Sequence, residues 1–204
     1  MIVIILLLFF KGFYIMPKLI LIKHAQPIIV PENPPNTWQL SPEGHEATRA
    51  FAPIVKNYTP KHIFSSPEHK ALETALTLAE SLHIGFEIVE GLYEHERANE
   101  KFQDHDMFVD KMRHFFAHPD ELVYGQETAA HARARFHVGL FGAWRKHRHH
   151  DVAVVAHGTV ISLFVSHVIP QIDGFELWKC LKLPDMVVLE TDDFNDFTLI
   201  KGCN

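Results

Sequence analysis

Two histidines follow two apolar runs that lie far apart in the chain. Residues 19–22 are apolar and lead through Lys23 into His24, and the apolar residues 152–156 lead directly into His157. Histidine serves proteins as a nucleophile, as an acid or base, and as a metal ligand. Because both histidines take the same place after a strand-like run, we expect them to share one site.

Strands of a parallel sheet are the elements that would position these histidines. Apolar runs without alternation are typical of strands buried on both faces under layers of helices. Strand-like and helix-like segments alternate along the chain, which predicts a three-layer α/β/α sandwich with a mostly parallel sheet. Residues 186–191 and 197–200 are spaced like a β-hairpin, so one edge strand should be antiparallel. Ligands bind beyond the carboxyl ends of strands in such sheets, where both histidines would lie.

Two of the predicted helices carry apolar residues at spacings of three and four, and we expect these stripes to face the core. The helix that begins after Ser41 has a stripe made of Ala47, Ala50, Phe51, Ile54 and Val55. The helix predicted over residues 126–150 has one made of Ala130, Ala134, Val138, Phe141 and Trp144. Its basic, histidine-rich end should be a solvated helix terminus rather than a metal site, because no set of carboxylates or thiolates accompanies it.

The composition limits the partners and the compartment. A formal net charge of −6 over 204 residues provides no global basic field for nucleic acid or for an anionic membrane. Two cysteines, Cys180 and Cys203, are too few for a disulfide framework, so we expect both to be free thiols. Free thiols suit a reducing compartment, and we predict a cytoplasmic protein.

The first ten residues are all apolar and are followed by Lys11. This run is shorter than the roughly 20 residues that span a bilayer, and it lacks the basic start and cleavage site of a signal peptide. We therefore expect residues 1–16 to be an extension outside the fold and residues 17–204 to form a single domain. The alternative is a weak membrane anchor.

The pair of histidines has three possible uses: a metal pair, an acid–base pair, or a nucleophile with an electrostatic partner. Metal sites usually add carboxylates, yet neither His24 nor His157 has an Asp or Glu within four residues. Cations are near instead, since Lys23 adjoins His24 and Lys70 lies early in the helix that follows residues 65–67. Converging cations repel a metal ion and attract an oxyanion, so the sequence favours an anion as the ligand.

Six segments resemble, in the same order, the signature motifs of the histidine phosphatase superfamily, also called the phosphoglycerate mutase-like family. They are residues 23–25 (Lys-His-Ala), 40–44 (Leu-Ser-Pro-Glu-Gly), 65–75 (Ser-Ser-Pro-Glu-His-Lys-Ala-Leu-Glu-Thr-Ala), 92–94 (Leu-Tyr-Glu), 125–128 (Gly-Gln-Glu-Thr) and 154–158 (Val-Val-Ala-His-Gly). The resemblance extends from residue 18 to about residue 200. It implies the phosphoglycerate mutase-like fold and phosphatase chemistry without a metal or other cofactor.

The resemblance also implies a role for each matching residue. His24 would be the nucleophile and form a phosphohistidine, and His157 would donate a hydrogen bond to the phosphoryl oxygens. Glu94 would protonate the leaving oxygen and later deprotonate water. The backbone amide of Gly158, at a helix N-terminus, would also face the phosphate.

Two features of this chain leave alternatives open. Lys23 and Lys70 stand where the family has arginine, so two planar forks are replaced by point charges that orient a phosphoryl group less firmly, unless both are only solvated surface charges. Glu96 and Glu100 compete with Glu94 for the role of proton donor, although the motif spacing favours Glu94.

The leading hypothesis is a metal-independent phosphatase that acts on a phosphorylated small molecule or a phosphoprotein. The alternative is a catalytically weak or inactive relative that binds a phosphorylated ligand or partner, which the two lysines favour. A mutase is the weaker possibility, because nothing in the sequence identifies a pocket for a sugar acid. Residues 27–38 and 92–120 should shape the substrate site.

Overall fold

The computed structural model describes residues 16–100 and 103–203. A six-stranded mixed sheet forms its centre, in the order β3-β2-β4-β1-β5-β6. Four adjacent strands run parallel to one another: β1 (Lys18–Lys23), β2 (His62–Ser65), β3 (Gly85–Ile88) and β4 (Val152–Ala156). Two form the predicted hairpin and run antiparallel to the strands beside them: β5 (Asp185–Glu190) and β6 (Thr198–Lys201). The predicted fold class is therefore confirmed.

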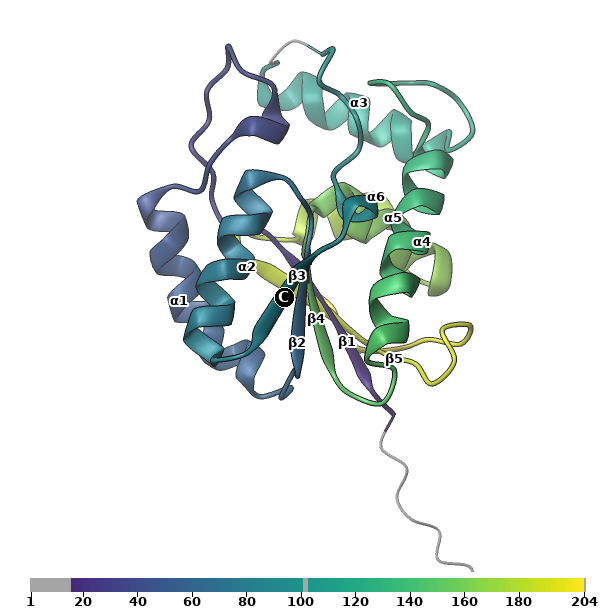
Figure 1. The fold of residues 1–204 in the computed structure, drawn as a ribbon. Helices are drawn as coiled ribbons and strands as arrows, with labels where there is room; N and C mark the ends of the chain where they lie inside the picture. Colours follow the sequence, from purple (N-terminus) through teal and green to yellow (C-terminus); the bar gives the residue numbers. More distant parts are fainter. Residues whose placement is uncertain (1–15, 101–102, 204) are drawn as a thin grey trace, which may run out of the picture.

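Helices cover both faces of the sheet (Figure 1). One layer contains α1 (Pro42–Lys56) and α2 (His69–Leu82), and the other contains α4 (Ala129–Lys146), α5 (Gly158–Val168) and α6 (Gly174–Cys180). Helix α3 (His105–Ala117) lies beyond the end of the sheet at which β1 ends (Figure 1). Two short 3₁₀ turns, Pro35–Thr37 and Glu90–Leu92, connect these elements.

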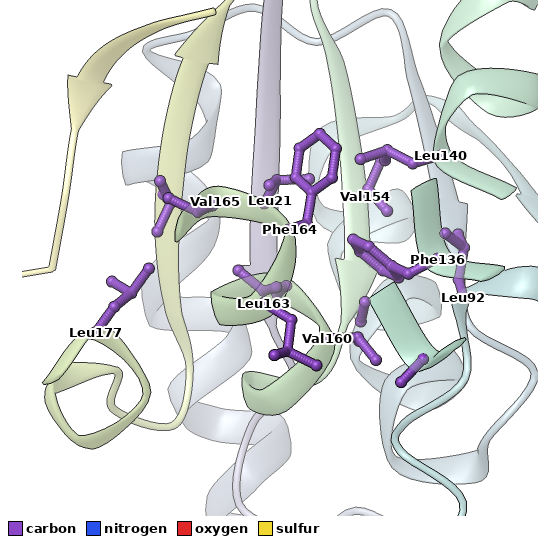
Figure 2. Close-up of a cluster of buried hydrophobic side chains, with 14 of the residues drawn as sticks. Leu21, Leu92, Phe136, Leu140, Val154, Val160, Leu163, Phe164, Val165 and Leu177 are labelled. Atoms are coloured by element: carbon purple, nitrogen blue, oxygen red, sulfur yellow. The ribbon is translucent and has the colours of Figure 1, made fainter. Parts of the chain in front are cut away.

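The two central strands are buried on both faces, as their unbroken apolar sequences predict. In β1, Leu19 and Leu21 pack into the cluster under α4 and α5, while Ile20 and Ile22 pack into the cluster under α1 and α2. Figure 2 shows the first cluster, in which Phe164 of α5 lies over the sheet. These buried strands form a rigid base for the residues that follow them.

Both predicted helix stripes were partly wrong. In α1, Ile54 is 45% exposed. The buried residues are Gly44, Thr48, Ala52 and Val55, so only Val55 of the predicted stripe is buried. Gly44 fixes the rotation of the helix, because a Cβ atom there would lie only 2.3 Å from the backbone oxygen of Gln26. In α4, Val138 is 71% exposed.

Helix α4 carries a second apolar stripe that faces the core in place of the predicted one. This buried stripe is Ala129, Ala132, Phe136, Leu140, Ala143 and Trp144, so of the predicted stripe only Trp144 is fully buried and Phe141 lies exposed. The ring of Phe136 meets that of Phe164 edge-on at 6.0 Å between centroids. Contact with α5 therefore selects between two stripes that have the same helical spacing.

The prediction of free thiols was also wrong, because Cys180 and Cys203 form a disulfide. The end of the chain after β6 returns to the end of α6, which places the two Cα atoms 6.0 Å apart. The argument for a reducing compartment rested on free thiols and loses its basis.

Among the described helices, none is long and apolar enough to cross a membrane. The expected extension, and the alternative of a membrane anchor, concern residues 1–15, which lie outside the described residues.

Candidate active site

The two predicted histidines meet at the carboxyl ends of neighbouring parallel strands. Strand β1 pairs with β4 so that Lys23 lies opposite Ala156, and each strand is followed at once by its histidine. The rings of His24 and His157 are 5.2 Å apart between centroids, in an edge-on arrangement. The structure thus brings together two residues that are 133 positions apart.

His24 is held with one ring nitrogen free. Its Nδ1 atom lies 2.7 Å from the carbonyl oxygen of Ala25, and because a carbonyl only accepts, Nδ1 must carry the proton. Burial lowers the pKa of His24 well below its usual value, and the nearby His157 and Lys70 lower it further. The ring is therefore neutral at physiological pH, and its Nε2 atom keeps a lone pair.

His157 is fully buried, and its two nitrogens differ. The Nε2 atom lies 2.7 Å from the hydroxyl oxygen of Ser66, whereas Nδ1 has no hydrogen-bond partner among the described residues. Burial lowers the pKa of His157 well below its usual value, and Lys70 adds to this effect. A buried nitrogen without a partner costs free energy, so Nδ1 is a candidate contact for a ligand.

Glu94 is buried, whereas its rival Glu96 is exposed. One oxygen of Glu94 accepts from the backbone N–H of His95 at 2.9 Å, and the other accepts from that of Thr159 at 3.3 Å. Thr159 lies in the first turn of α5, so this carboxylate is placed at the positive end of a helix. Glu100 pairs instead with a lysine of α3 at 3.4 Å.

The charge state of Glu94 depends on opposing effects. Burial alone would raise its pKa, but the positive charge of Arg97, the adjacent His157 and the His95 N–H outweigh burial, so the pKa is lowered. The nearest oxygen of Glu94 lies 3.9 Å from the Arg97 guanidinium. Glu94 is therefore ionised in the unliganded protein at neutral pH.

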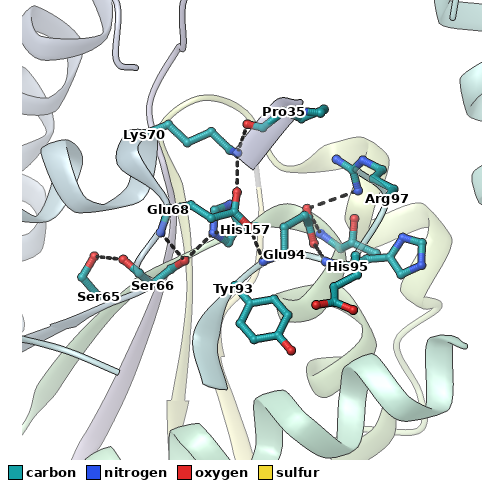
Figure 3. A network of polar contacts seen from close by, with 12 residues as sticks. Pro35, Ser65, Ser66, Glu68, Lys70, Tyr93, Glu94, His95, Arg97 and His157 are labelled. Atoms are coloured by element: carbon teal, nitrogen blue, oxygen red, sulfur yellow. Dashed lines mark hydrogen bonds and ion pairs between the residues drawn. The ribbon is translucent and has the colours of Figure 1, made fainter. Parts of the chain in front are cut away.

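Lys70 is not a solvated charge, since it is only 5% exposed. Its ammonium donates to the carboxylate of Glu68 at 2.5 Å and to the carbonyl of Pro35 at 2.7 Å (Figure 3). Because its charge lowers the pKa of both His24 and His157, this ammonium lies within electrostatic reach of both histidines.

Lys23 is also engaged by the protein, because its ammonium donates to the carbonyl of Leu181 at 2.8 Å. Burial lowers its pKa, against the opposing effects of Glu94 and Asp185. The side chain runs past Gly158, where a Cβ atom would come within 3.2 Å of the Lys23 stem. Glycine at this position therefore gives Lys23 the room to reach the site.

A cavity of about 460 Å³ opens above the buried carboxylates. Its walls include Pro35, Glu68, Lys70, Glu94 and Arg97. Parts of residues 27–38 and 92–120 line it, which are the two segments expected to shape the substrate site.

Three residues of the site were missed by the sequence analysis: Ser66, Glu68 and Arg97. Ser66 and Glu68 fall in the segment that resembles a family motif, but the resemblance assigned no role to either. Arg97 follows Glu94 by three residues, a spacing that gave no sign of an ion pair in a non-helical segment. Their contacts become visible only when the segments around β2 and β3 are packed together.

Comparison with solved structures shows the same fold. A mycobacterial glucosyl-3-phosphoglycerate phosphatase matches with a TM-score of 0.71 and 18% sequence identity, over 92% of this chain and 99% of the other. A phosphoserine phosphatase from Entamoeba histolytica, crystallised with 3-phosphoglyceric acid, matches with a TM-score of 0.73 and 17% identity, over 93% of this chain and 98% of the other. Among curated proteins, none matches this chain by sequence.

The sequence also matches a family model. Residues 19–195 fit the model of the histidine phosphatase superfamily, branch 1. This range begins in β1 and extends beyond β5, so it includes every element that positions the site. By sequence and by fold, the chain is a member of the histidine phosphatase superfamily.

Proposed function

We propose that this protein hydrolyses a phosphomonoester through a phosphohistidine formed on His24, without a metal ion. The observation that carries the proposal is the hydrogen bond from His24 Nδ1 to the Ala25 carbonyl, which leaves the Nε2 lone pair free in a neutral ring. Two phosphatases among the structural neighbours support the general activity.

In the first half of the proposed reaction, His24 Nε2 attacks phosphorus and a bond forms between them. The bond from phosphorus to the ester oxygen breaks, and its electron pair goes to that oxygen, which takes a proton from Glu94. His157 would donate from Nδ1 to a phosphoryl oxygen, because Nδ1 is the nitrogen without a protein partner. Ser66, next to Nε2, favours this tautomer when its hydroxyl donates to Nε2.

In the second half, water attacks phosphorus and gives its proton to the Glu94 carboxylate. The phosphorus–nitrogen bond breaks, and its electron pair returns to His24 Nε2, so that inorganic phosphate leaves with the enzyme restored. Glu94 must be protonated at the start of each turnover, yet it is ionised in the unliganded protein. A phosphoryl anion bound beside it raises its pKa, because two neighbouring negative charges disfavour the ionised carboxylate.

The substrate would be a phosphorylated small molecule or a phosphoprotein. A second cavity of about 820 Å³ adjoins the first and shares Pro35 and Arg97 with it. Its walls include the aromatic rings of Trp38, Phe108 and Tyr124. We propose that this cavity receives the alcohol part of the ester.

A second candidate function is binding of a phosphorylated ligand with little or no turnover. The contacts of the two lysines favour it, because Lys70 is engaged by Glu68 and Pro35, and Lys23 by the Leu181 carbonyl. Cations that are already engaged orient a phosphoryl group less firmly, and poor orientation slows phosphoryl transfer more than it weakens binding.

Release of phosphate from p-nitrophenyl phosphate in excess chelator tests the proposal. We expect the wild-type protein to release phosphate, and His24→Ala to abolish release. In a rapid-quench experiment, an acid-labile phosphoryl label should accumulate on the wild type and not on His24→Ala. His131→Ala, at an exposed position in α4, is the matched control for loss of a histidine.

Two results would decide against this mechanism. Loss of activity in chelator, restored by a divalent metal ion, would contradict the metal-independent reaction. If the protein binds phosphate but hydrolyses none of a panel of phosphomonoesters, the second candidate function would be favoured.

A further inference from the structure

Glu68 places a negative charge in a cavity that also has to accept an anion. It immediately precedes α2, is only 8% exposed, and lines the same cavity as Lys70 and Glu94. One of its oxygens accepts from the backbone N–H of Glu94 at 2.8 Å and lies 3.8 Å from His157 Nε2. The other oxygen lies 2.5 Å from the Lys70 ammonium, so a phosphoryl group that contacts Lys70 would lie close to this carboxylate.

Glu68 is ionised in the unliganded protein. Burial alone would raise its pKa, but the ion pair with Lys70 and the Glu94 N–H outweigh burial, so the pKa is lowered. Like charges at short distance in a poorly solvated cavity repel strongly. The carboxylate thus opposes a phosphoryl anion directly.

Glu68 opposes the anion in a second way, through Lys70. An ammonium group has three N–H donors, and Lys70 donates one hydrogen bond to Glu68 and one to the Pro35 carbonyl (Figure 3). Its charge is already neutralised at 2.5 Å before a ligand arrives. When a phosphoryl oxygen replaces Glu68 at the ammonium, the net gain in binding free energy is only the difference between the two charge-assisted contacts.

We propose that Glu68 is a specificity-determining residue that competes with phosphoryl oxygens for Lys70 and thereby weakens the binding of free phosphate and of small phosphate esters. The inference rests on the proposed function. Esters whose alcohol part makes further contacts are then preferred, and inorganic phosphate leaves readily after each turnover. Glu68 acts in this way on affinity, whereas His24 and His157 act on the chemical step.

The affinity for inorganic phosphate and for vanadate, measured by calorimetry, tests this role without requiring turnover. Glu68→Gln keeps an oxygen for the Glu94 N–H but cannot pair with Lys70, so both anions should bind on the order of tenfold more tightly. Glu80→Gln removes the same charge from an exposed position of α2 and should leave both affinities unchanged. Weaker or unchanged binding by Glu68→Gln would overturn the inference, because it would mean that Glu68 only positions Lys70.

A double-mutant cycle separates competition for Lys70 from direct repulsion. In a Lys70→Met background, Glu68→Gln should increase phosphate affinity by much less than it does when Lys70 is present. If the effect is undiminished there, competition for Lys70 is excluded. Glu68→Asp, whose shorter carboxylate should withdraw from Lys70, is the second variant if Glu68→Gln does not fold.

Steady-state kinetics gives a further readout that a merely structural role would not move. Glu68→Gln should lower KM for p-nitrophenyl phosphate and the inhibition constant of inorganic phosphate, while kcat stays constant or falls because product leaves more slowly. Absence of turnover in every variant would contradict the proposed function, whereas tighter phosphate binding by Glu68→Gln would still support this inference.

Discussion

The two sides of the site differ in how many of their polar groups already have a hydrogen-bond or ion-pair partner within the protein. The histidine floor, which consists of His24 and His157, keeps one nitrogen of each ring without a hydrogen-bond partner in the described part of the chain. The cationic rim, which consists of Lys23 and Lys70, is engaged by carbonyl groups and by the carboxylate of Glu68. The floor is thus ready for a ligand, while the rim has to exchange one partner for another.

This difference separates chemistry from affinity. The nucleophile proposed here needs a lone pair, and the neutral ring of His24 has one on Nε2, because Nδ1 carries the proton. Cations that already have partners contribute less to ligand binding, because each new contact replaces an old one. Changes in the floor should therefore affect turnover most, and changes in the rim should affect binding and orientation.

The largest effect should follow from a change in the floor. His157→Asn removes the donor that we assign to the phosphoryl oxygens, so kcat should fall roughly 10²–10³-fold while KM changes little. Steady-state kinetics on p-nitrophenyl phosphate measures this split. If kcat/KM falls by the same factor because KM rises while kcat changes little, His157 acts in substrate binding instead. The distinction between floor and rim would then be lost.

A smaller effect should follow from changes in the rim. Lys70→Arg and Lys23→Arg each supply extra donors, so that protein contacts can be kept while a phosphoryl group is also bound, and turnover should rise up to about tenfold. Vanadate should also bind more tightly, and the two effects should be non-additive because both residues hold one phosphoryl group. A wild type that is already fast on its substrate and is slowed by both arginines would show that the lysines suit that substrate.

The smallest effect concerns stability and pH. The folded-state pKa of His24 is well below its unfolded value of about 6.5. As the pH falls, the His24 ring therefore becomes protonated in the unfolded chain while it stays neutral in the folded protein. Stability from this residue is complete above pH 6.5 and is lost below it, by about 1.4 kcal/mol per pH unit. His24→Asn should reduce the slope of unfolding free energy against pH by up to that amount as the pH falls below 6.5.

In thermal unfolding, the same change corresponds to about 3–6 °C per pH unit for a chain of this size. Denaturant unfolding at several pH values measures the slope, and His131→Asn in the exposed face of α4 controls for the number of histidines. An unchanged slope in His24→Asn would mean that the floor does not hold its histidine neutral.

Sequence patterns were most informative for strands that are buried on both faces of the sheet. The runs in β1 and β4 are apolar, and such strands are buried whichever helices cover them. Their parallel pairing and the position of both histidines at the same end of the sheet were therefore predicted correctly. Helix faces were harder, because α4 carries two apolar stripes and only contact with Phe164 shows which one is buried. The disulfide of Cys180 and Cys203 depends in the same way on where the end of the chain packs.

The sequence by itself determined the floor, because a histidine that directly follows a buried parallel strand has one place to lie, at the rim of the sheet. The resemblance to a family motif favoured Glu94 over Glu96, and the structure buries Glu94 and leaves Glu96 exposed. Only the tertiary structure decided the state of the rim. Whether Lys70 meets Glu68, and Lys23 the carbonyl of Leu181, depends on distances between segments that are remote in sequence or joined by a turn. Charge and hydrogen-bond partners act over a few ångströms in space, and residue spacing along the chain does not report those distances.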